Sequence, residues 1–156
     1  MDVSQRAAAL ERLQPLVGEW DTEATFSFAP EPIPGRVTFE WELGGQFLLE
    51  RSSVEHPAAP DGLAVIAVAE DGDGYVQHYF DSRGVVRTYR MTLRDDVWTL
   101  LRDRPDFTPL DFAQRYTGTF GADGQTITGQ WEISHDGGTT WERDFGLNYR
   151  RAPGTR

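Results

Sequence analysis

The sequence predicts an all-β protein: a closed, up-and-down antiparallel β-barrel of about ten strands with one short N-terminal helix. Three observations predict this fold. Short segments that alternate apolar and polar residues follow one another from residue 18 to residue 150, and turn sequences rather than helical ones separate them. The first segment opens on Gly18-Glu19-Trp20, and the last closes on Arg150-Arg151. We expect these two ends to meet at the seam of the barrel, where a guanidinium stacks on the indole.

The one helical pattern covers about residues 4–16, before the first strand. Ser4 is suited to the N-cap position, and Pro15 ends the pattern. Apolar residues recur at helical spacing at Ala7, Leu10, Leu13 and Val17. We expect this helix to cover one mouth of the barrel.

The strands follow the helix in quick succession. We expect them at about 18–28, 36–43, 46–55, 63–69, 75–80, 85–93, 97–103, 111–120, 126–134 and 140–150. Gly and Asp turns such as Gly44-Gly45 join most of them as hairpins. The 104–110 segment holds two prolines and is long for such a connection. It is either a lid over the barrel or a rigid connector.

The alternation also predicts which side chains point inward. Trp20, Thr22, Ala24, Phe26 and Phe28 share one face of the first strand, and Trp41 lies on the apolar face of the second. In the later strands we expect Val76, His78 and Phe80, then Phe112, Gln114 and Tyr116, then Ile127 and Trp131, then Arg143, Phe145, Leu147 and Tyr149 to face inward. Glu50 and Arg51 are neighbours in one strand, so at most one of them lies inside. Arg90 is ambiguous in the same way.

The polar members of these faces, with two tryptophans as cavity walls, are the candidate ligand-binding residues. The set comprises Trp41, Glu50, His78, Arg90, Gln114, Tyr116, Trp131 and Arg143. His78 is the sharpest candidate, because an imidazole inside a barrel can contact a polar ligand group or act as an acid or base near neutral pH. A hydrogen-bonded core histidine is the alternative. An inward Glu50 needs a partner, for which Arg90 or Arg143 would serve. We assign no catalytic residue.

Composition limits the function classes. The chain has 156 residues, which suits a single domain over 1–156. A net charge of −10 disfavours nucleic acid as a partner, and the absence of a long apolar run disfavours a membrane. The polar N-terminus has no secretory pattern and the chain has no cysteine, so we expect a cytoplasmic protein without disulfides or thiolate metal sites.

Metal and cofactor sites are not predicted. The three histidines, His56, His78 and His135, are dispersed and show no metal-ligand spacing. The Asp71-Gly72-Asp73-Gly74 turn lacks the ligand spacing and terminal Glu of a calcium loop. No nucleophile motif or phosphate-binding loop occurs.

Two stretches carry a resemblance to a known family. Leu16-Val17-Gly18-Glu19-Trp20, followed by the hairpin from Gly44 to Arg51, resembles a bacterial family known as domain-of-unknown-function family 1579, and the resemblance includes 77–84 and 129–132. The family is similar to the calycins, a group with the lipocalins, fatty-acid-binding proteins and nitrobindins. The resemblance implies a calycin-like barrel with an internal cavity. Nitrobindins bind haem through a late histidine, but the strand from Trp141 to Arg150 has none, which disfavours haem.

Taken together, the sequence predicts a barrel that binds a small, apolar or amphipathic molecule in its interior. Aromatic residues make up 12% of the chain, enough to supply the walls of such a site. We expect binding rather than catalysis, with an enzyme that uses a histidine acid or base as the alternative. A barrel filled with side chains, serving as an interaction module, is a further alternative, and a homodimer is an open alternative to a monomer.

Overall fold

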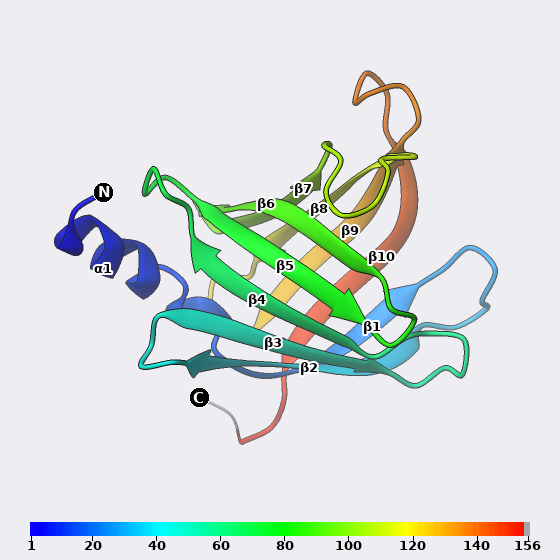
Figure 1. Ribbon diagram of the computed structural model, residues 1–156. Coiled ribbons are helices and arrows are strands. Elements are labelled where there is room, and N and C mark those ends of the chain that lie inside the picture. Colours follow the sequence, from blue (N-terminus) through cyan, green and yellow to red (C-terminus); the bar gives the residue numbers. More distant parts are fainter. Residues whose placement is uncertain (155–156) are drawn as a thin grey trace.

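The protein forms a closed barrel of ten antiparallel strands with one helix at its N-terminus, as the sequence predicts (Figure 1). This computed structural model describes residues 1–154. The helical elements are α1 (Val3–Glu11) and the 3-10 turn η1 (Gln14–Leu16). The strands are β1 (Gly18–Thr25), β2 (Ile33–Glu42), β3 (Phe47–Val54), β4 (Gly62–Val68), β5 (Tyr75–Asp81), β6 (Val86–Arg94), β7 (Val97–Arg102), β8 (Ala113–Phe120), β9 (Thr126–Ser134) and β10 (Glu142–Arg151).

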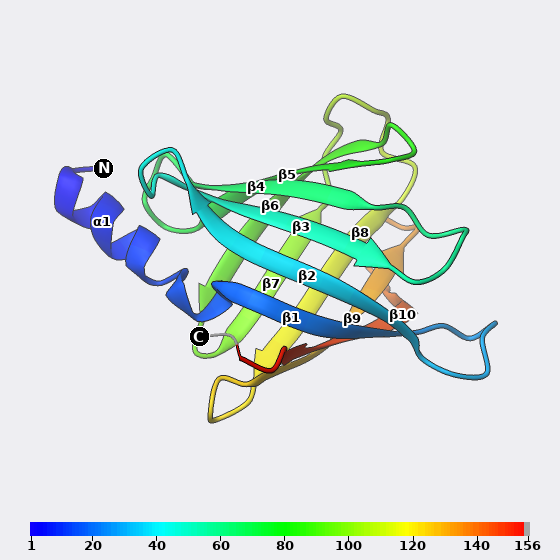
Figure 2. The same cartoon turned by 90° about the horizontal axis from the view of Figure 1, so that it is seen from below.

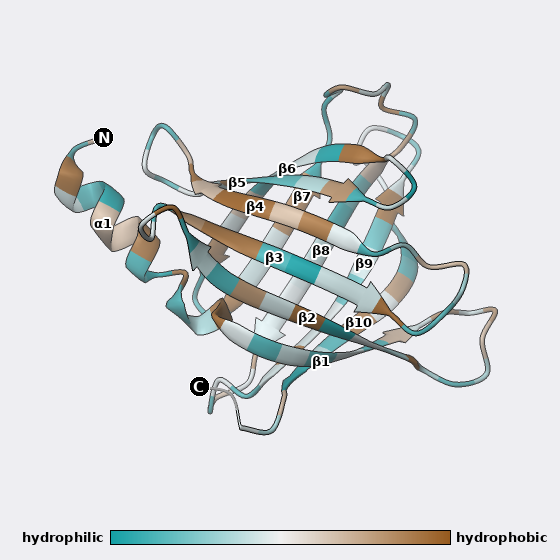
Figure 3. Cartoon of the chain, turned by 60° about the horizontal axis from the view of Figure 1, so that its bottom comes forward, coloured by the Kyte–Doolittle hydropathy of each residue, from teal (hydrophilic) through white to brown (hydrophobic). Residues whose placement is uncertain are grey.

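Each strand pairs with its neighbours in the sequence, and β1 pairs with β10 to close the barrel (Figure 2). Figure 3 shows hydrophilic and hydrophobic residues following one another along β2, which is how one face lines the interior while the other meets solvent. Closure leaves no free sheet edge.

Several boundaries differ from the predicted ones for local reasons. Asp2, not Ser4, is the N-cap of α1, because its side chain accepts from the Gln5 amide while the Gln5 side chain accepts from the Asp2 amide. β1 ends at Thr25, so Phe28 lies in the following loop and is exposed rather than on the inner face. β2 begins before Gly35, at Ile33.

The helix covers one mouth of the barrel. Ala9, Leu13 and Leu16 are buried on this side of the molecule. The Tyr75 hydroxyl, at the start of β5, donates a hydrogen bond of 2.6 Å to the Ala9 carbonyl. We call this the helix end. Among the described residues, no helix has the length and apolar character needed to cross a bilayer.

The predicted seam is confirmed at the helix end. Trp20 pairs with Arg151 across β1 and β10, and the Arg151 guanidinium carbon lies 4.2 Å from the centre of the indole. The same guanidinium donates to the carbonyls of Val17 at 2.7 Å and Pro15 at 2.6 Å. The Trp20 indole N–H donates to the Leu16 carbonyl at 2.9 Å. These contacts tie the first strand, the last strand and η1 together.

The two ends of the barrel differ in their connections. Short turns lie at the helix end, between β2 and β3 and between β6 and β7 (Figure 1). The longer loops lie at the opposite end, which we call the loop end: 26–32, 55–61, 103–112 and 135–141. Large side chains fill the helix-end half of the interior: Trp20, Phe39, Leu48, Ile66, Trp98 and Ile127 are each almost completely buried. Any space for a ligand therefore lies toward the loop end.

Candidate functional site

Glu50 is the charged residue that the barrel places at mid-height inside. It pairs with Phe39 of β2 and Ala64 of β4, both buried, so its side chain lies on the inner face. Arg51 therefore points outward, where it lies 3.8 Å from the exposed Glu40. Because neighbouring residues of a strand point to opposite faces, only one of Glu50 and Arg51 can lie inside, and in this barrel it is Glu50.

The Glu50 carboxylate is enclosed but unpartnered. Its Oε2 atom is buried and has no hydrogen-bond partner among the described residues. Burial alone raises the pKa of Glu50 to about 7, because removal from water penalises the charged form and no protein cation compensates. The residue as a whole is not completely buried. One oxygen of the carboxyl group is thus enclosed in the barrel without a partner, although the residue keeps some exposed surface.

Aromatic side chains surround this position. The Trp98 ring lies 6.0 Å from Phe39, 5.2 Å from Tyr116 and 5.6 Å from Tyr149, centre to centre. Burial, and then the negative charge of Glu50, raise the pKa of Tyr116 above its ordinary value. Burial raises the pKa of Tyr149 well above its ordinary value, and the charge of Glu50 raises it further. Glu50 therefore shares one region of the interior with these two phenols.

Tyr116 is held in place by small neighbours. Its hydroxyl donates to the Leu147 carbonyl at 3.0 Å. A Cβ on Gly129 or on Gly118 would overlap the Tyr116 ring or hydroxyl. The two glycines of β8 and β9 thus leave the room that the phenol occupies. Trp131 contacts Tyr116 at 5.4 Å and Tyr89 at 5.6 Å and extends the aromatic wall toward the loop end.

Two further buried polar groups have no partner among the described residues. They are the side-chain carbonyl oxygen of Gln77 and the indole N–H of Trp98. Gln77 is only 3% exposed and lies on the inner face, opposite Tyr89. Such groups are uncommon in folded interiors and are expected where water or a ligand supplies the missing hydrogen bond.

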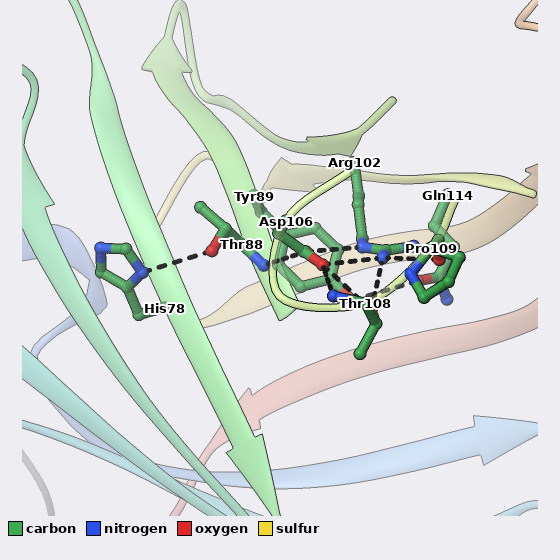
Figure 4. Close-up of polar contacts among 8 residues, drawn as sticks. All are labelled: His78, Thr88, Tyr89, Arg102, Asp106, Thr108, Pro109 and Gln114. Carbon is green, nitrogen blue, oxygen red and sulfur yellow. Dashed lines mark hydrogen bonds and ion pairs between the residues drawn. The ribbon is translucent and has the colours of Figure 1, made fainter. Parts of the chain in front are cut away.

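A polar cluster closes the loop-end side of the interior (Figure 4). The Tyr89 hydroxyl donates to Gln114 Oε1 at 3.3 Å. On the adjoining strand, Arg102 Nε donates to Asp106 Oδ2 at 2.9 Å, and both side chains are almost completely buried, at 4% and 7% exposed. Asp106 belongs to the loop between β7 and β8. Its pKa lies far below the ordinary value, chiefly because of Arg102.

The same pair fixes the 103–112 loop. Asp106 also accepts from the Thr88 amide at 2.9 Å and from the Thr108 amide and hydroxyl. Arg102 donates to Thr108 Oγ1 at 3.0 Å. This loop is therefore pinned to β6 and β7, as the rigid-connector alternative expects, and not a free flap.

The expected inward placement of His78 is wrong. Tyr75, Gln77 and Tyr79 face the interior from β5, whereas His78 is exposed on the outer wall. Its Nδ1 lies 3.4 Å from the Thr88 hydroxyl, and Figure 4 shows its ring well apart from the Arg102–Asp106 pair. The two faces of β5 each carry aromatic residues, so hydropathy did not distinguish them. His78 therefore cannot act as an acid or base inside the barrel.

Arg143 and Arg90 also lie outside. A bulge between Arg143 and Phe145 shifts the register of β10, so Arg143 pairs with the outward Glu132 while Phe145 pairs with the inward Trp131. The Arg143 guanidinium lies where a side chain on Gly146 would be. Arg90 forms an exposed ion pair with Asp103 at 2.8 Å. Neither arginine can serve Glu50 as a partner.

The remaining candidates lie on the inner face at different heights. Trp41 lies at the helix end, where its indole N–H donates to Gln14 Oε1 at 3.3 Å. Glu50, Tyr116, Gln114 and Trp131 lie toward the middle and the loop end. Phe112, expected on the inner face of β8, lies in the preceding loop beside His135, with ring centres 6.0 Å apart.

The sequence reasoning missed the inward residues Gln77, Tyr79, Tyr89, Trp98 and Arg102. Only the pairing of Gln77 with the buried Ile66 shows which face of β5 points inward, and only the pairing of Tyr89 with Gln77 shows this for β6.

His56 lies in the 55–61 loop and His135 in the 135–141 loop. Within residues 1–154, no three His, Asp or Glu side chains gather into a metal site.

Comparison with known proteins supports the architecture. No protein-family model matches this chain, and no curated protein matches it. A similar solved structure is the crystal structure of Rv2717c from M. tuberculosis, with a TM-score of 0.63 and 17% identity, covering 92% of this chain and 97% of that one. That likeness shows the fold alone. The relation to family 1579 and to the calycins stays a prediction.

Proposed function

We propose that this protein binds a small, partly apolar molecule inside the barrel, between Glu50 and the loop end. The observation that carries the proposal is the enclosed, unpartnered carboxylate of Glu50. A buried carboxylate without a partner is costly, and such groups are retained where a ligand or water completes the site.

The exposure of inward side chains supports a hollow region beside Glu50. Trp131 faces inward and contacts Tyr89 and Tyr116, and yet it is only partly buried. Tyr79 and Leu147, also on the inner face, are partly buried too. An inward side chain of a closed barrel keeps exposed surface at an open mouth of the barrel or where the interior leaves room for a water-sized or larger molecule.

The lining suits a ligand with an apolar body and one polar group. Trp131, Tyr89 and Leu147 offer apolar surface, while Glu50, Gln77 and Gln114 offer polar atoms. A mostly aromatic wall with a few polar groups is the usual composition of a small-molecule site. The rigid Arg102–Asp106 pair keeps the adjoining wall in one conformation, which lowers the entropic cost of binding.

Titration with a neutral fluorescent aromatic amine, 1-aminoanthracene, tests the proposal. We expect saturable binding with a rise in probe fluorescence and quenching of tryptophan emission. Leu147→Trp places a large ring in the same space and should abolish binding. Val3→Trp, on the exposed face of α1, is the matched control and should leave it intact. Absence of saturable binding, or equal binding by both variants, would contradict an interior site.

A further inference from the structure

We infer that the polar group of the ligand is a protonated amine that forms an ion pair with the Glu50 carboxylate; this inference rests on the interior binding site proposed above. It names the chemical class of the ligand: an amphipathic cation whose ammonium group lies at mid-barrel and whose apolar body extends toward the loop end.

Charge is the first reason. Glu50 forms no ion pair among the described residues, and burial alone accounts for its raised pKa. Arg102, a buried arginine in the loop-end cluster, is already neutralised by Asp106. A cationic ligand would supply the missing counter-charge, and an anionic ligand would add a second negative charge to an unpaired one.

The aromatic lining is the second reason. Tyr89, Trp131 and Tyr116 form a continuous chain of ring contacts at 5.6 Å and 5.4 Å on the inner wall. The faces of such rings attract cations and disfavour anions, and the attraction is largest where water is excluded. A carboxylate beside an aromatic wall favours an ammonium over a neutral hydroxyl, which gains little from either.

The other titratable groups around Glu50 stay neutral near physiological pH. They are Tyr79 on β5, Tyr116 on β8 and Tyr149 on β10, and burial raises the pKa of each above its ordinary value. Phe39 on β2 and Ala64 on β4, its paired neighbours, do not titrate. Arg87 on β6 lies opposite Tyr79, and its charge acts on Tyr89, whereas no cation perturbs Glu50.

Glu50 is therefore the group whose ionisation controls cation binding in this region. With a pKa of about 7, Glu50 is almost fully ionised at about pH 8.5 and almost fully protonated at about pH 5.5. An alkyl ammonium stays charged at both values, because its pKa resembles that of lysine. Since only the ionised form forms the pair, affinity should be about 30-fold higher at the upper pH.

Isothermal titration calorimetry with decylamine, decanol and decanoate, below their micelle concentrations, tests the inference on the intact protein. The three share one apolar body and differ only in the polar group. We expect decylamine to bind most tightly at pH ~8.5 and to weaken about 30-fold at pH ~5.5. Decanol should bind more weakly with no comparable pH dependence, and decanoate should be weakest at the upper pH.

Two variants locate the effect. Glu50→Gln should weaken decylamine binding about tenfold or more at pH ~8.5 and remove its pH dependence. Glu40→Gln alters an exposed glutamate on the outer face of the adjoining strand and should change neither. The comparison of polar groups in the unsubstituted protein remains decisive if Glu50→Gln does not fold.

The outcomes separate this inference from the proposed function. If decanol binds as tightly as decylamine, if decanoate binds best, or if Glu50→Gln binds decylamine as the parent does, the amine assignment is wrong while an interior site stands. If none of the three ligands binds and 1-aminoanthracene does not bind either, both the interior site and the amine assignment are wrong.

Discussion

Glu50 is an interior carboxylate whose cost to stability no other group of the described residues offsets. A carboxylate in the interior costs free energy when it ionises, and a neutral side chain of the same size would avoid this cost. The structure gives Glu50 neither a cation nor a full set of hydrogen-bond partners. This lack of partners is the basis of the proposed interior binding site.

Glu50 should also make the stability of the free protein depend on pH. Its pKa is about 7 in the folded protein and close to 4.5 when exposed, so between these values the folded state holds a proton that the unfolded state has lost. The contribution of this group to stability is therefore greatest below about pH 4.5, falls as the pH rises to about 7, and is constant above. The total loss is about 3 kcal/mol.

Urea unfolding at about pH 5 and about pH 8 measures this loss. Glu50→Gln should show a smaller fall in unfolding free energy over that interval, by roughly 2–3 kcal/mol, because its side chain does not titrate. Glu40→Gln should keep the parent's dependence. Parallel profiles for the parent and Glu50→Gln would show that Glu50 has an ordinary pKa.

At the scale of elements, the loop between β7 and β8 is held by a buried ion pair rather than by apolar packing. Phe107, at the tip of this loop, is 80% exposed and contributes little burial. Asp106 instead accepts from Arg102, Thr88 and Thr108, and so joins the loop to the ends of β6 and β7. The carboxylate provides an acceptor for the Thr88 amide where the pairing of β6 with β7 has ended.

Removal of Asp106 should be costly for this reason. Asp106→Ala leaves Arg102 buried without a counter-charge, and we expect a loss of about 3 kcal/mol in unfolding free energy. Hydrogen exchange of the Thr88 amide should accelerate, because that amide loses its acceptor.

An exposed ion pair on the same strands provides the control. Asp103→Ala removes the surface partner of Arg90 and should cost less than about 1 kcal/mol. The double variant Arg102→Met/Asp106→Leu should recover much of the stability that Asp106→Ala loses, because no unpaired charge remains. Similar small losses for Asp103→Ala and Asp106→Ala would show that the buried pair does not hold the loop.

At the scale of the whole molecule, closure divides the barrel into two unequal halves. At the helix end, α1 covers the mouth, and Trp20 with Arg151 joins the first strand to the last. At the loop end, longer connections surround an interior whose side chains are partly exposed. The filled half supplies the packing that stabilises the fold, and the proposed ligand site lies in the other half.

The seam should contribute to global stability. Arg151→Met removes two hydrogen bonds to carbonyls of 15–17 and the stacking on Trp20, and we expect a loss of about 2 kcal/mol. The matched control is Arg150→Met, on the exposed face of the same strand, which should cost less than about 0.5 kcal/mol. Guanidinium unfolding followed by tryptophan emission measures both. Equal losses would show that the Arg151 contacts do not stabilise closure.

The sequence by itself determined the strand order, the single helix and the seam. The alternation of apolar and polar residues within each strand, and the turn residues between strands, are local properties. They therefore predict a meander without knowledge of the tertiary contacts. Trp20 and Arg151 were identifiable because closure of a meander brings the first and last strands together. Gln114, Tyr116 and Trp131 were placed on the inner face by the same local alternation, whereas the alternation in the third strand left open whether Glu50 or Arg51 points inward.

Only the tertiary structure decided which face of each ambiguous strand points inward. A shift of one residue turns every side chain to the opposite face, and in β5 both faces carry aromatic residues, so His78 was placed inside when Gln77 belongs there. The bulge in β10 turned Arg143 outward in the same way. The lack of a partner for Glu50 also depends on all surrounding strands at once, because a missing hydrogen bond is a property of packed neighbours and not of local sequence.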